Sequence, residues 1–154
     1  MEKIRVGIIG AGWIAHKMAQ TLGPLKDAEV LAIASRSEEK AKEFAAEYGI
    51  SKAYGSYEAL VSDPDVDLVY IATPHSHHYQ HTKLALEHDK AVLVEKAFTA
   101  NAREAKELLD MAKERGLFLT EAIWTRYMPL SHKVKELMDS GIIGEPRVLT
   151  ATLC

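Results

Sequence analysis

An acid and a base stand side by side where an apolar run ends. They are Glu95 and Lys96, which follow Ala-Val-Leu-Val at residues 91–94. Four apolar residues in a row are typical of a short strand that is buried on both faces. The charged pair is either solvated where the strand reaches the surface or directed into a reaction site. In the second case the lysine amine is a candidate for proton transfer, provided that desolvation or a nearby cation lowers its pKa from about 10.4.

A glycine-rich loop near the N-terminus indicates a second chemical function. Gly10, Gly12 and Ala15 form G-x-G-x-x-A in "GAGWIA", which also contains Trp13 and Ile14. The loop follows a strand-like run and opens a helix-like one, which is the context that dinucleotide binding requires. The first glycine permits a tight turn, the second lets the backbone approach a pyrophosphate, and the alanine allows close helix packing. The alternative is a tight turn without a ligand, in which Trp13 serves only for packing.

The end of the second predicted strand indicates which dinucleotide is bound. Sites for NAD carry an acid there that binds the ribose hydroxyls, whereas this chain has Ala-Ser-Arg-Ser at residues 34–37. Arg36 matches the geometry of a 2′-phosphate, and Ser35 and Ser37 can donate to it. We therefore expect NADP(H), with NAD(H) as the second choice. In the alternative interpretation Arg36 is solvated and Ser37 only caps a helix, and the missing acid also argues against a methyltransferase.

Four histidines in one short segment, namely His75, His77, His78 and His81, raise the possibility of a metal site. His77 and His81 stand one helical turn apart, a spacing that suits two ligands. No cysteine or acid lies close enough in this segment to complete the ligand set. We therefore expect no metal, a place for His78 at a helix start beside the cofactor, and solvated rings for the others.

The elements that must position these residues alternate between short apolar strands and amphipathic helices. We expect strands at Ile4–Ile9, Val30–Ala34, Lys52–Tyr54, Leu68–Ala72, Ala91–Val94 and Leu117–Leu119. We expect helices at Trp13–Leu22, Glu38–Tyr48, Tyr57–Val61, His75–His88, from a cap at Asn101 to Arg115, and at Pro129–Met138. This alternation predicts an α/β fold with a doubly wound, mostly parallel sheet. Right-handed crossovers then bring the carboxyl ends of the strands, and the motifs after them, to one edge.

Composition limits the remaining classes of function. The 154 residues are 47% hydrophobic and 27% charged, which is typical of one soluble globular domain. The net charge of −3 offers no basic footprint for nucleic acid, and no apolar run is long enough to span a membrane. Lys3 and Arg5 before an apolar run imitate a signal peptide, but two glycines interrupt that run. The single Cys154 forms no internal disulfide, so we expect a cytoplasmic protein.

Four motifs together carry a resemblance to a known family. In order along the chain, "GAGWIA", "ATPHSHH", "EKA" and "EAIWTRYMP" resemble the Gfo/Idh/MocA oxidoreductases, and "TEAIWTRYMP" is similar to the dihydrodiol dehydrogenase (D-xylose dehydrogenase) branch. The resemblance covers essentially the whole chain. It implies an N-terminal Rossmann domain and a C-terminal α/β domain that supplies much of the substrate pocket and the usual dimer contact. We expect an NADP(H)-binding domain with its closing helix at residues 1–144 and the first strand of a truncated second domain at 145–154.

The same resemblance implies the roles of individual residues. It places the lysine of the Glu-Lys pair at the nicotinamide and the substrate hydroxyl, so that Lys96 is the predicted catalytic residue. The family often has asparagine at the position of His75, and proline at the position of Ala97, where it would stiffen the turn that aims the lysine. Packing remains the alternative for Trp124, and an ion pair the alternative for Arg126. The predicted cofactor-binding residues are Gly10, Gly12, Trp13, Ile14, Ala15, Ser35, Arg36, Thr73, Pro74, His75, His78, Glu95, Lys96, Trp124 and Arg126.

Two functional hypotheses follow. In the first, the intact protein is an NADP-dependent oxidoreductase that acts on a secondary alcohol of a sugar or cyclic diol, as a homodimer that binds neither nucleic acid nor membrane. Nicotinamide carries the hydride in such enzymes, so the protein supplies position and proton transfer. In the second, the chain is a dinucleotide-binding module without catalysis, either a redox-sensing regulator or an inactive fragment. We expect the chain alone to be inactive, because the substrate pocket would lack its second wall.

Overall fold

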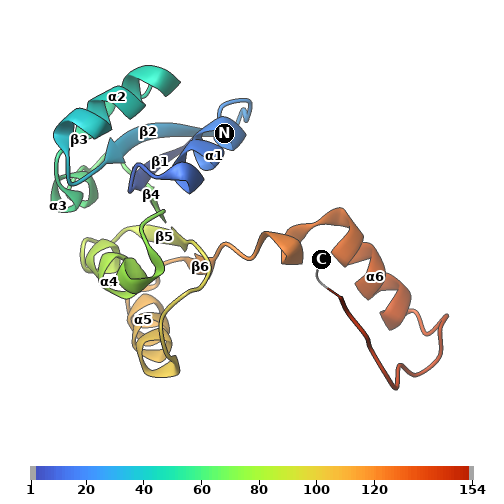
Figure 1. Cartoon of the computed structure of the whole chain (residues 1–154). Helices are drawn as coiled ribbons and strands as arrows, with labels where there is room; N and C mark the ends of the chain where they lie inside the picture. Colours follow the sequence, from blue (N-terminus) through green and yellow to red (C-terminus); the bar gives the residue numbers. More distant parts are fainter. Residues whose placement is uncertain (1–2, 153–154) are drawn as a thin grey trace. The chain divides into compact units, whose positions relative to one another are not determined.

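One parallel sheet organises the part of the chain that carries the predicted motifs. The computed structural model describes residues 3–152, and within them six strands pair in the order β3-β2-β1-β4-β5-β6 (Figure 1). Every pairing is parallel. The strands are β1 (Ile4–Ile9), β2 (Ala28–Ala34), β3 (Lys52–Tyr54), β4 (Leu68–Ile71), β5 (Ala91–Val94) and β6 (Leu119–Glu121). The predicted doubly wound α/β fold is therefore confirmed.

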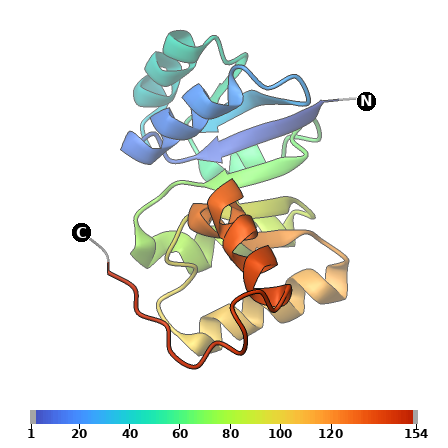
Figure 2. The same cartoon turned by 90° about the vertical axis from the view of Figure 1, so that its right-hand side faces the viewer.

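The strand order reverses direction between β1 and β4, which lie side by side in the middle of the sheet (Figure 2). From β1 the chain winds outward through β2 to β3, and it then returns to β4 and winds outward the other way. In open α/β sheets, ligands bind outside the carboxyl ends of the strands at such a switch point. The residues that follow β1 and β4 therefore occupy the position in the fold where a ligand is expected.

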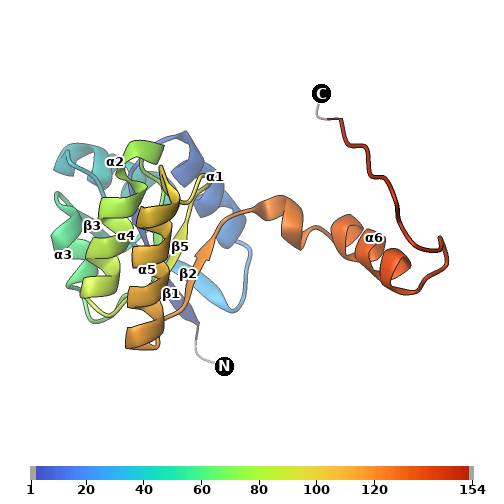
Figure 3. The ribbon, with the colours of Figure 1, turned by 90° about the horizontal axis from the view of Figure 1, so that it is seen from below.

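The helices before residue 116 cover both faces of the sheet. Within the described residues the helices are α1 (Trp13–Leu22), α2 (Glu38–Tyr48), α3 (Tyr57–Val61), α4 (His78–Glu87), α5 (Ala102–Arg115) and α6 (Pro129–Asp139), with short 3-10 turns η1 (His75–His77) and η2 (Trp124–Tyr127). Successive strand residues point to opposite faces. Accordingly, Ile8 packs with Phe44 of α2 in one apolar cluster, whereas Ile9 packs with Leu86 of α4 and Leu108 of α5 in the other. Figure 3 shows α4 and α5 side by side.

The ends of the helices follow the sequence signals with two differences. Gly49 and Gly116 adopt positive φ values of 67° and 65° and end α2 and α5, as left-handed glycine caps do. The predicted helix from His75 begins instead with the 3-10 turn η1 before α4. The last strand begins at Leu119 rather than at Leu117, because the Leu117 N–H donates to the Ala112 carbonyl and so still belongs to the helix cap.

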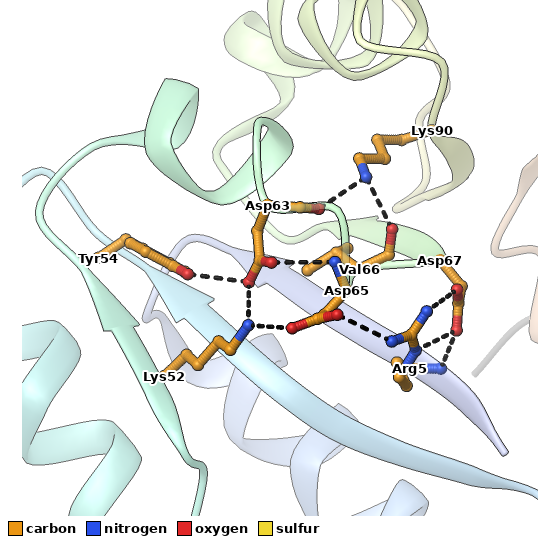
Figure 4. Close-up of polar contacts among 8 residues, drawn as sticks. All are labelled: Arg5, Lys52, Tyr54, Asp63, Asp65, Val66, Asp67 and Lys90. Carbon is orange, nitrogen blue, oxygen red and sulfur yellow. Dashed lines mark hydrogen bonds and ion pairs between the residues drawn. The ribbon is translucent and has the colours of Figure 1, made fainter.

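Ion pairs hold together the amino ends of the strands, at the edge opposite the predicted site (Figure 4). Arg5 of β1 pairs with Asp65 and Asp67, and Lys52 of β3 pairs with Asp63 and Asp65. Lys90, just before β5, donates to main-chain carbonyls of the same connection between α3 and β4. These contacts connect the segment between α3 and β4 to β1, to β3 and to the residue just before β5.

The chain divides into two compact units, one ending at Ala122 and one beginning at Ile123. The second unit contains η2 and α6, and inside it the Ser131 hydroxyl donates to the Thr125 carbonyl at 2.5 Å. Residues 145–152 form no strand. A strand needs a neighbouring strand for its main-chain hydrogen bonds, and residues 145–152 pair with none. The expected boundary at residue 144 and the strand after it stay predictions. Residues 153 and 154, the last two of that predicted strand, lie outside the described residues.

None of the helices within residues 3–152 has the length and apolar character needed to cross a membrane.

Candidate cofactor and active site

The carboxyl ends of β1, β2 and β4 surround a hollow of about 380 Å³. Most of the residues predicted to bind the cofactor meet here. The lining residues are Gly10, Ala11, Gly12, Trp13, Ile14, Ser35, Arg36, Lys40, Tyr57, Ala72, Thr73 and Pro74. This lining contains two cationic side chains and no carboxylate, so its charge suits an anionic ligand.

The absence of a side chain has a different structural reason at Gly10 than at Gly12. Gly10 has a φ of 99°, and a Cβ built on it would lie 2.9 Å from the carbonyl oxygen of Ala72. A side chain is therefore excluded at Gly10 by the protein itself. Gly12 has a φ of −92°, and nothing lies within 4 Å of a Cβ built there. The open space beside Gly12 is the cradle that a close-lying ligand would fill.

The loop leads directly into α1, whose N-terminus has no side-chain cap. The first N–H groups of a helix lack intrahelical partners and favour an anion. Ala15 is fully buried under this turn, as the predicted close packing requires. Trp13 is exposed, and the Lys17 ammonium lies 5.5 Å from the centre of its ring. The loop thus offers backbone N–H donors to a ligand, and the exposed Trp13 ring contacts the Lys17 ammonium.

The segment after β2 brings two positive charges to the hollow. Ser37 accepts a hydrogen bond from the Lys40 N–H and caps α2, so the capping alternative holds for this serine. Arg36 lines the hollow together with Ser35. Lys40 also lines it, although the sequence interpretation did not include it. The signal that could have found Lys40 is its place in the first turn of the helix that follows Arg36, on the chain segment that leaves β2.

A smaller pocket of about 220 Å³ shares Arg36, Tyr57, Thr73 and Pro74 with the hollow and adds His77, Gln80 and His81. The His81 Nδ1 lies 3.0 Å from the Thr73 hydroxyl, and its ring meets Tyr57 edge-on with 4.6 Å between centroids. Burial, followed by the charge of His77, lowers the pKa of His81 to about 4. A pocket that is lined by Tyr57, His77 and a neutral His81 suits a heterocyclic base. Tyr57 was missed because nothing in its local sequence distinguishes it from a packing residue.

The four histidines of this segment do not form a metal-binding cluster among the described residues. The His77 and His81 rings stack with 5.7 Å between their centroids. Across residues 3–152 there is no cluster of three or more histidine, cysteine or acidic side chains that could hold a metal ion. His75 is exposed on η1, but His81 is buried against Thr73, so the expectation of a solvated ring was wrong for His81.

Glu95 and Lys96 stand at the carboxyl end of β5. The Tyr70 hydroxyl donates to Glu95 Oε1 at 2.5 Å, and the Lys96 N–H donates to Glu95 Oε2 at 3.2 Å. Burial of Tyr70, followed by its hydrogen bond to Glu95, raises the pKa of this tyrosine, which therefore remains a donor. Lys96 is exposed, and its peptide bond to Ala97 is cis. Tyr70 of β4 thus fixes the Glu95 carboxylate, whereas the Lys96 side chain is exposed.

Two further contacts hold the turn that carries Lys96. The Phe98 N–H donates to Glu121 Oε1 of β6 at 2.8 Å. His78 is fully buried, and its Nδ1 lies 2.7 Å from the Ala97 carbonyl oxygen while its Nε2 lies 2.8 Å from that of Thr73. The His78 ring is therefore engaged with main chain on both sides. Glu121 was missed because its role depends on which strand lies beside β5.

Trp124 and Arg126 lie on η2 in the second unit. The predicted place of these two residues at the nicotinamide end stays a prediction.

Comparison with known proteins identifies the neighbours of this chain. Residues 4–123 match the GFO_IDH_MocA family model, described as an oxidoreductase family with an NAD-binding Rossmann fold. The D-xylose 1-dehydrogenase (NADP(+)) of Hypocrea jecorina is 48% identical, with 92% of this chain and 39% of that protein covered. The trans-1,2-dihydrobenzene-1,2-diol dehydrogenase of Homo sapiens is 43% identical, with 96% of this chain and 45% of that protein covered. The chain thus spans less than half the length of these relatives.

A solved structure shows the same fold. The 3-ketoreductase KijD10 from Actinomadura kijaniata, crystallised with NADP, superimposes with a TM-score of 0.85 at 37% identity. The match covers 94% of this chain and 46% of that one.

Proposed function

This chain belongs to the Gfo/Idh/MocA oxidoreductase family, and we propose that it binds NADP(H) and serves hydride transfer at a secondary alcohol of a sugar or cyclic diol. The observation that carries the proposal is the hollow at the switch point, which the glycine loop, Arg36 and Thr73 line together. The names of the two relatives support the cofactor and the substrate class, because one is an NADP-dependent dehydrogenase of D-xylose and the other is a dehydrogenase of a cyclic diol.

The residues around the hollow fit a dinucleotide phosphate. The open space at Gly12 and the uncapped N-terminus of α1 suit the pyrophosphate. Arg36, Lys40 and Ser35 suit the 2′-phosphate, and no carboxylate in the lining repels it. The adjoining pocket between Tyr57 and His77 suits the adenine. These assignments place the parts of the cofactor along the carboxyl edge of the sheet, from β2 toward β5.

We place the nicotinamide end of the cofactor at the turn after β5. When bound, nicotinamide supplies the hydride chemistry. The contribution of this chain is a proton-transfer group, which we assign to Lys96, with Glu95 as its neighbour of fixed orientation. Tyr70 holds one oxygen of that carboxylate, and the Lys96 N–H holds the other. A homodimer and a cytoplasmic location belong to the same proposal and rest on the family resemblance and composition.

Two measurements test this function. Titration of the chain with NADPH and NADH, followed by fluorescence, should show tighter binding of NADPH. Equal or tighter binding of NADH would overturn the role of Arg36. In a turnover assay of the intact protein with NADP⁺ and a panel of pentoses, hexoses and trans-cyclic diols, Lys96→Met should retain NADPH affinity and lose about 10²-fold or more of its rate. Lys113→Met, an exposed lysine near the end of α5, is the matched control.

The second candidate is a dinucleotide-binding module without catalysis. The observation that favours it is the exposed position of Lys96, because burial is one of the influences that would tune a lysine for proton transfer. Tight NADPH binding without turnover of any substrate in the panel would favour the module, whereas loss of turnover in Lys96→Met alone would favour the enzyme.

A further inference from the structure

His78 occupies an unusual position between two loops. Its ring is fully buried at the start of α4. The Nε2 atom lies 2.8 Å from the carbonyl oxygen of Thr73, and the Nδ1 atom lies 2.7 Å from the carbonyl oxygen of Ala97. Both contacts have the length of good hydrogen bonds. One imidazole thus spans the loop after β4 and the turn after β5.

The hydrogen-bonding capacity of both partners constrains how the ring can satisfy them. A main-chain carbonyl oxygen only accepts hydrogen bonds, and a neutral imidazole has a single N–H. In a neutral ring, one nitrogen lone pair would face a carbonyl oxygen at hydrogen-bond distance without a proton between them. That arrangement is unfavourable for a buried group, because solvent does not replace the missing partner. Two donors to two carbonyls exist only in the imidazolium form.

We propose that His78 is an imidazolium that links the carbonyl oxygens of Thr73 and Ala97 and thereby positions Lys96. The role of Lys96 in this statement rests on the proposed function, whereas the link itself does not. Thr73 lines the hollow assigned to the cofactor, and Ala97 directly follows Lys96. The imidazolium therefore fixes the distance between the cofactor loop and the turn that carries the lysine. A displacement of about 1 Å in such a geometry can cost about 10²-fold in rate.

The groups around the ring are compatible with its charge. On η1, the His75 ring meets His78 edge-on with 5.4 Å between centroids. On α4, His81 has a pKa of about 4, lowered first by burial and then by His77, with a smaller contribution from the charge of His78. His81 is therefore neutral near pH 7 and does not repel the imidazolium. On the other side, Glu95 and Lys96 precede Ala97, and the Glu121 carboxylate accepts from the Phe98 N–H that follows it.

The test uses the ¹⁵N-labelled chain of 154 residues. At neutral pH, long-range ¹H–¹⁵N spectra should show both ring nitrogens of His78 in the protonated form. When the pH is raised until this ring loses a proton, one of the two contacts is lost. The amide signals of Lys96, Ala97 and Phe98 should then shift with the same midpoint as the ring. A ring nitrogen that is unprotonated at neutral pH, or amides that do not follow the ring, would overturn the proposal.

Two variants separate the link from general folding. The amide of His78→Gln donates from one nitrogen only, so the shared midpoint should disappear. His88→Gln is the control, because the exposed His88 contacts a single carbonyl, that of Leu84, at the far end of α4, and its loss should leave the midpoint unchanged. If His78→Gln does not fold, the ring measurement on the unaltered chain still decides the protonation state.

A kinetic measurement tests the positioning role. Where turnover is measured, His78→Gln should lower kcat by about 10- to 100-fold and leave the Kd for NADPH within about twofold. An unchanged kcat, or a loss of NADPH affinity as large as the loss of kcat, would overturn the positioning role. If Lys96→Met retains full turnover while the ring and amides titrate together, the proposed catalytic function fails and the link between the loops stands.

Discussion

The Tyr70 hydroxyl donates to Glu95 Oε1 across 2.5 Å, from the middle of the sheet to the end of the neighbouring strand. The two residues are 25 positions apart in the sequence, and the pairing of β4 with β5 brings them together. Tyr70 is almost completely buried, whereas Glu95 is half-buried. A buried phenol thus fixes the carboxylate beside the predicted catalytic lysine, and it belongs to the apolar cluster that α1 and α2 cover.

Removal of this hydroxyl should cost stability. In Tyr70→Phe the Glu95 carboxylate loses a buried donor, and we expect the free energy of unfolding at neutral pH to fall by about 1–2 kcal/mol. Urea denaturation measures the change. Tyr79→Phe is the matched control, because its hydroxyl donates to Glu107 at 2.7 Å on the surface, where the loss should be about 0.5 kcal/mol or less. Equal losses in the two variants would contradict the importance of burial.

The same pair predicts a dependence on alkaline pH. The pKa of Tyr70 is raised in the folded chain, first by burial and then by Glu95, from an unfolded value of about 10. A raised folded pKa contributes stability that is present below the unfolded pKa and is lost as pH rises toward the folded one. Stability should therefore fall more steeply above about pH 10 in the unaltered chain than in Tyr70→Phe. Urea denaturation between about pH 8 and 11 compares the two slopes.

The two glycines of the loop should respond differently to alanine. Gly10→Ala places a Cβ 2.9 Å from the Ala72 carbonyl at a φ of 99°, so we expect a loss of stability of about 2 kcal/mol or more. Gly12→Ala meets no protein atom within 4 Å, so the variant should fold with nearly unchanged stability and lose NADPH affinity. Thermal unfolding and NADPH titration of both variants check this pair. Unchanged NADPH affinity in Gly12→Ala would move the pyrophosphate away from this loop.

Lys40 should discriminate between the two dinucleotides. If its ammonium meets the 2′-phosphate, Lys40→Met should weaken NADPH binding by about five- to tenfold and leave NADH binding unchanged. Lys42→Met is the control on the same helix, because Lys42 pairs with Glu38 at 2.6 Å and does not line the hollow. Parallel titrations with both dinucleotides measure the effect. An equal loss for NADH would place Lys40 at a phosphate that the two cofactors share.

Asp63 should be the critical acid at the opposite edge of the sheet. Its side chain is 5% exposed and accepts from Lys52 and from the Tyr54 hydroxyl, both at 2.8 Å. Asp63→Asn leaves Lys52 with only the exposed Asp65, so we expect a loss of about 1–3 kcal/mol at neutral pH. Asp65→Asn, with 54% of the side chain exposed, is the control and should cost less than about 1 kcal/mol.

The effect of Asp63 should vanish in acid. Burial alone would raise the pKa of this carboxyl, but hydrogen bonds from Lys52, the Asp65 N–H and Tyr54 hold it below its usual value. A depressed folded pKa contributes stability that is present above the unfolded value of about 4 and is lost as pH falls through the folded one. The difference between the unaltered chain and Asp63→Asn should therefore shrink below about pH 4. A constant difference down to about pH 2 would contradict this mechanism.

Local patterns predicted most of the elements and the first set of site residues. Apolar runs marked β1, β4 and β5, and glycine stops marked the ends of α2 and α5, because these signals depend on neighbours in the sequence. The same is true of the loop at Gly10 and Gly12, whose spacing already contained the turn and the helix start. The first turn of the helix after β4 was not predicted as 3-10, since that choice depends on how the segment packs.

The sequence by itself determined the parallel α/β sheet, the glycine loop, the missing acid beside Arg36 and the acid-base pair at residues 95 and 96. Only the tertiary structure decided what surrounds them. Tyr70 and Glu121 reach the turn after β5 because the register of three strands brings distant residues together. His78 was predicted beside the cofactor, but its two carbonyl partners depend on two loops that meet only in the fold. A residue type reveals which protons a side chain can carry, whereas the positions of its acceptors determine which of those protons it holds.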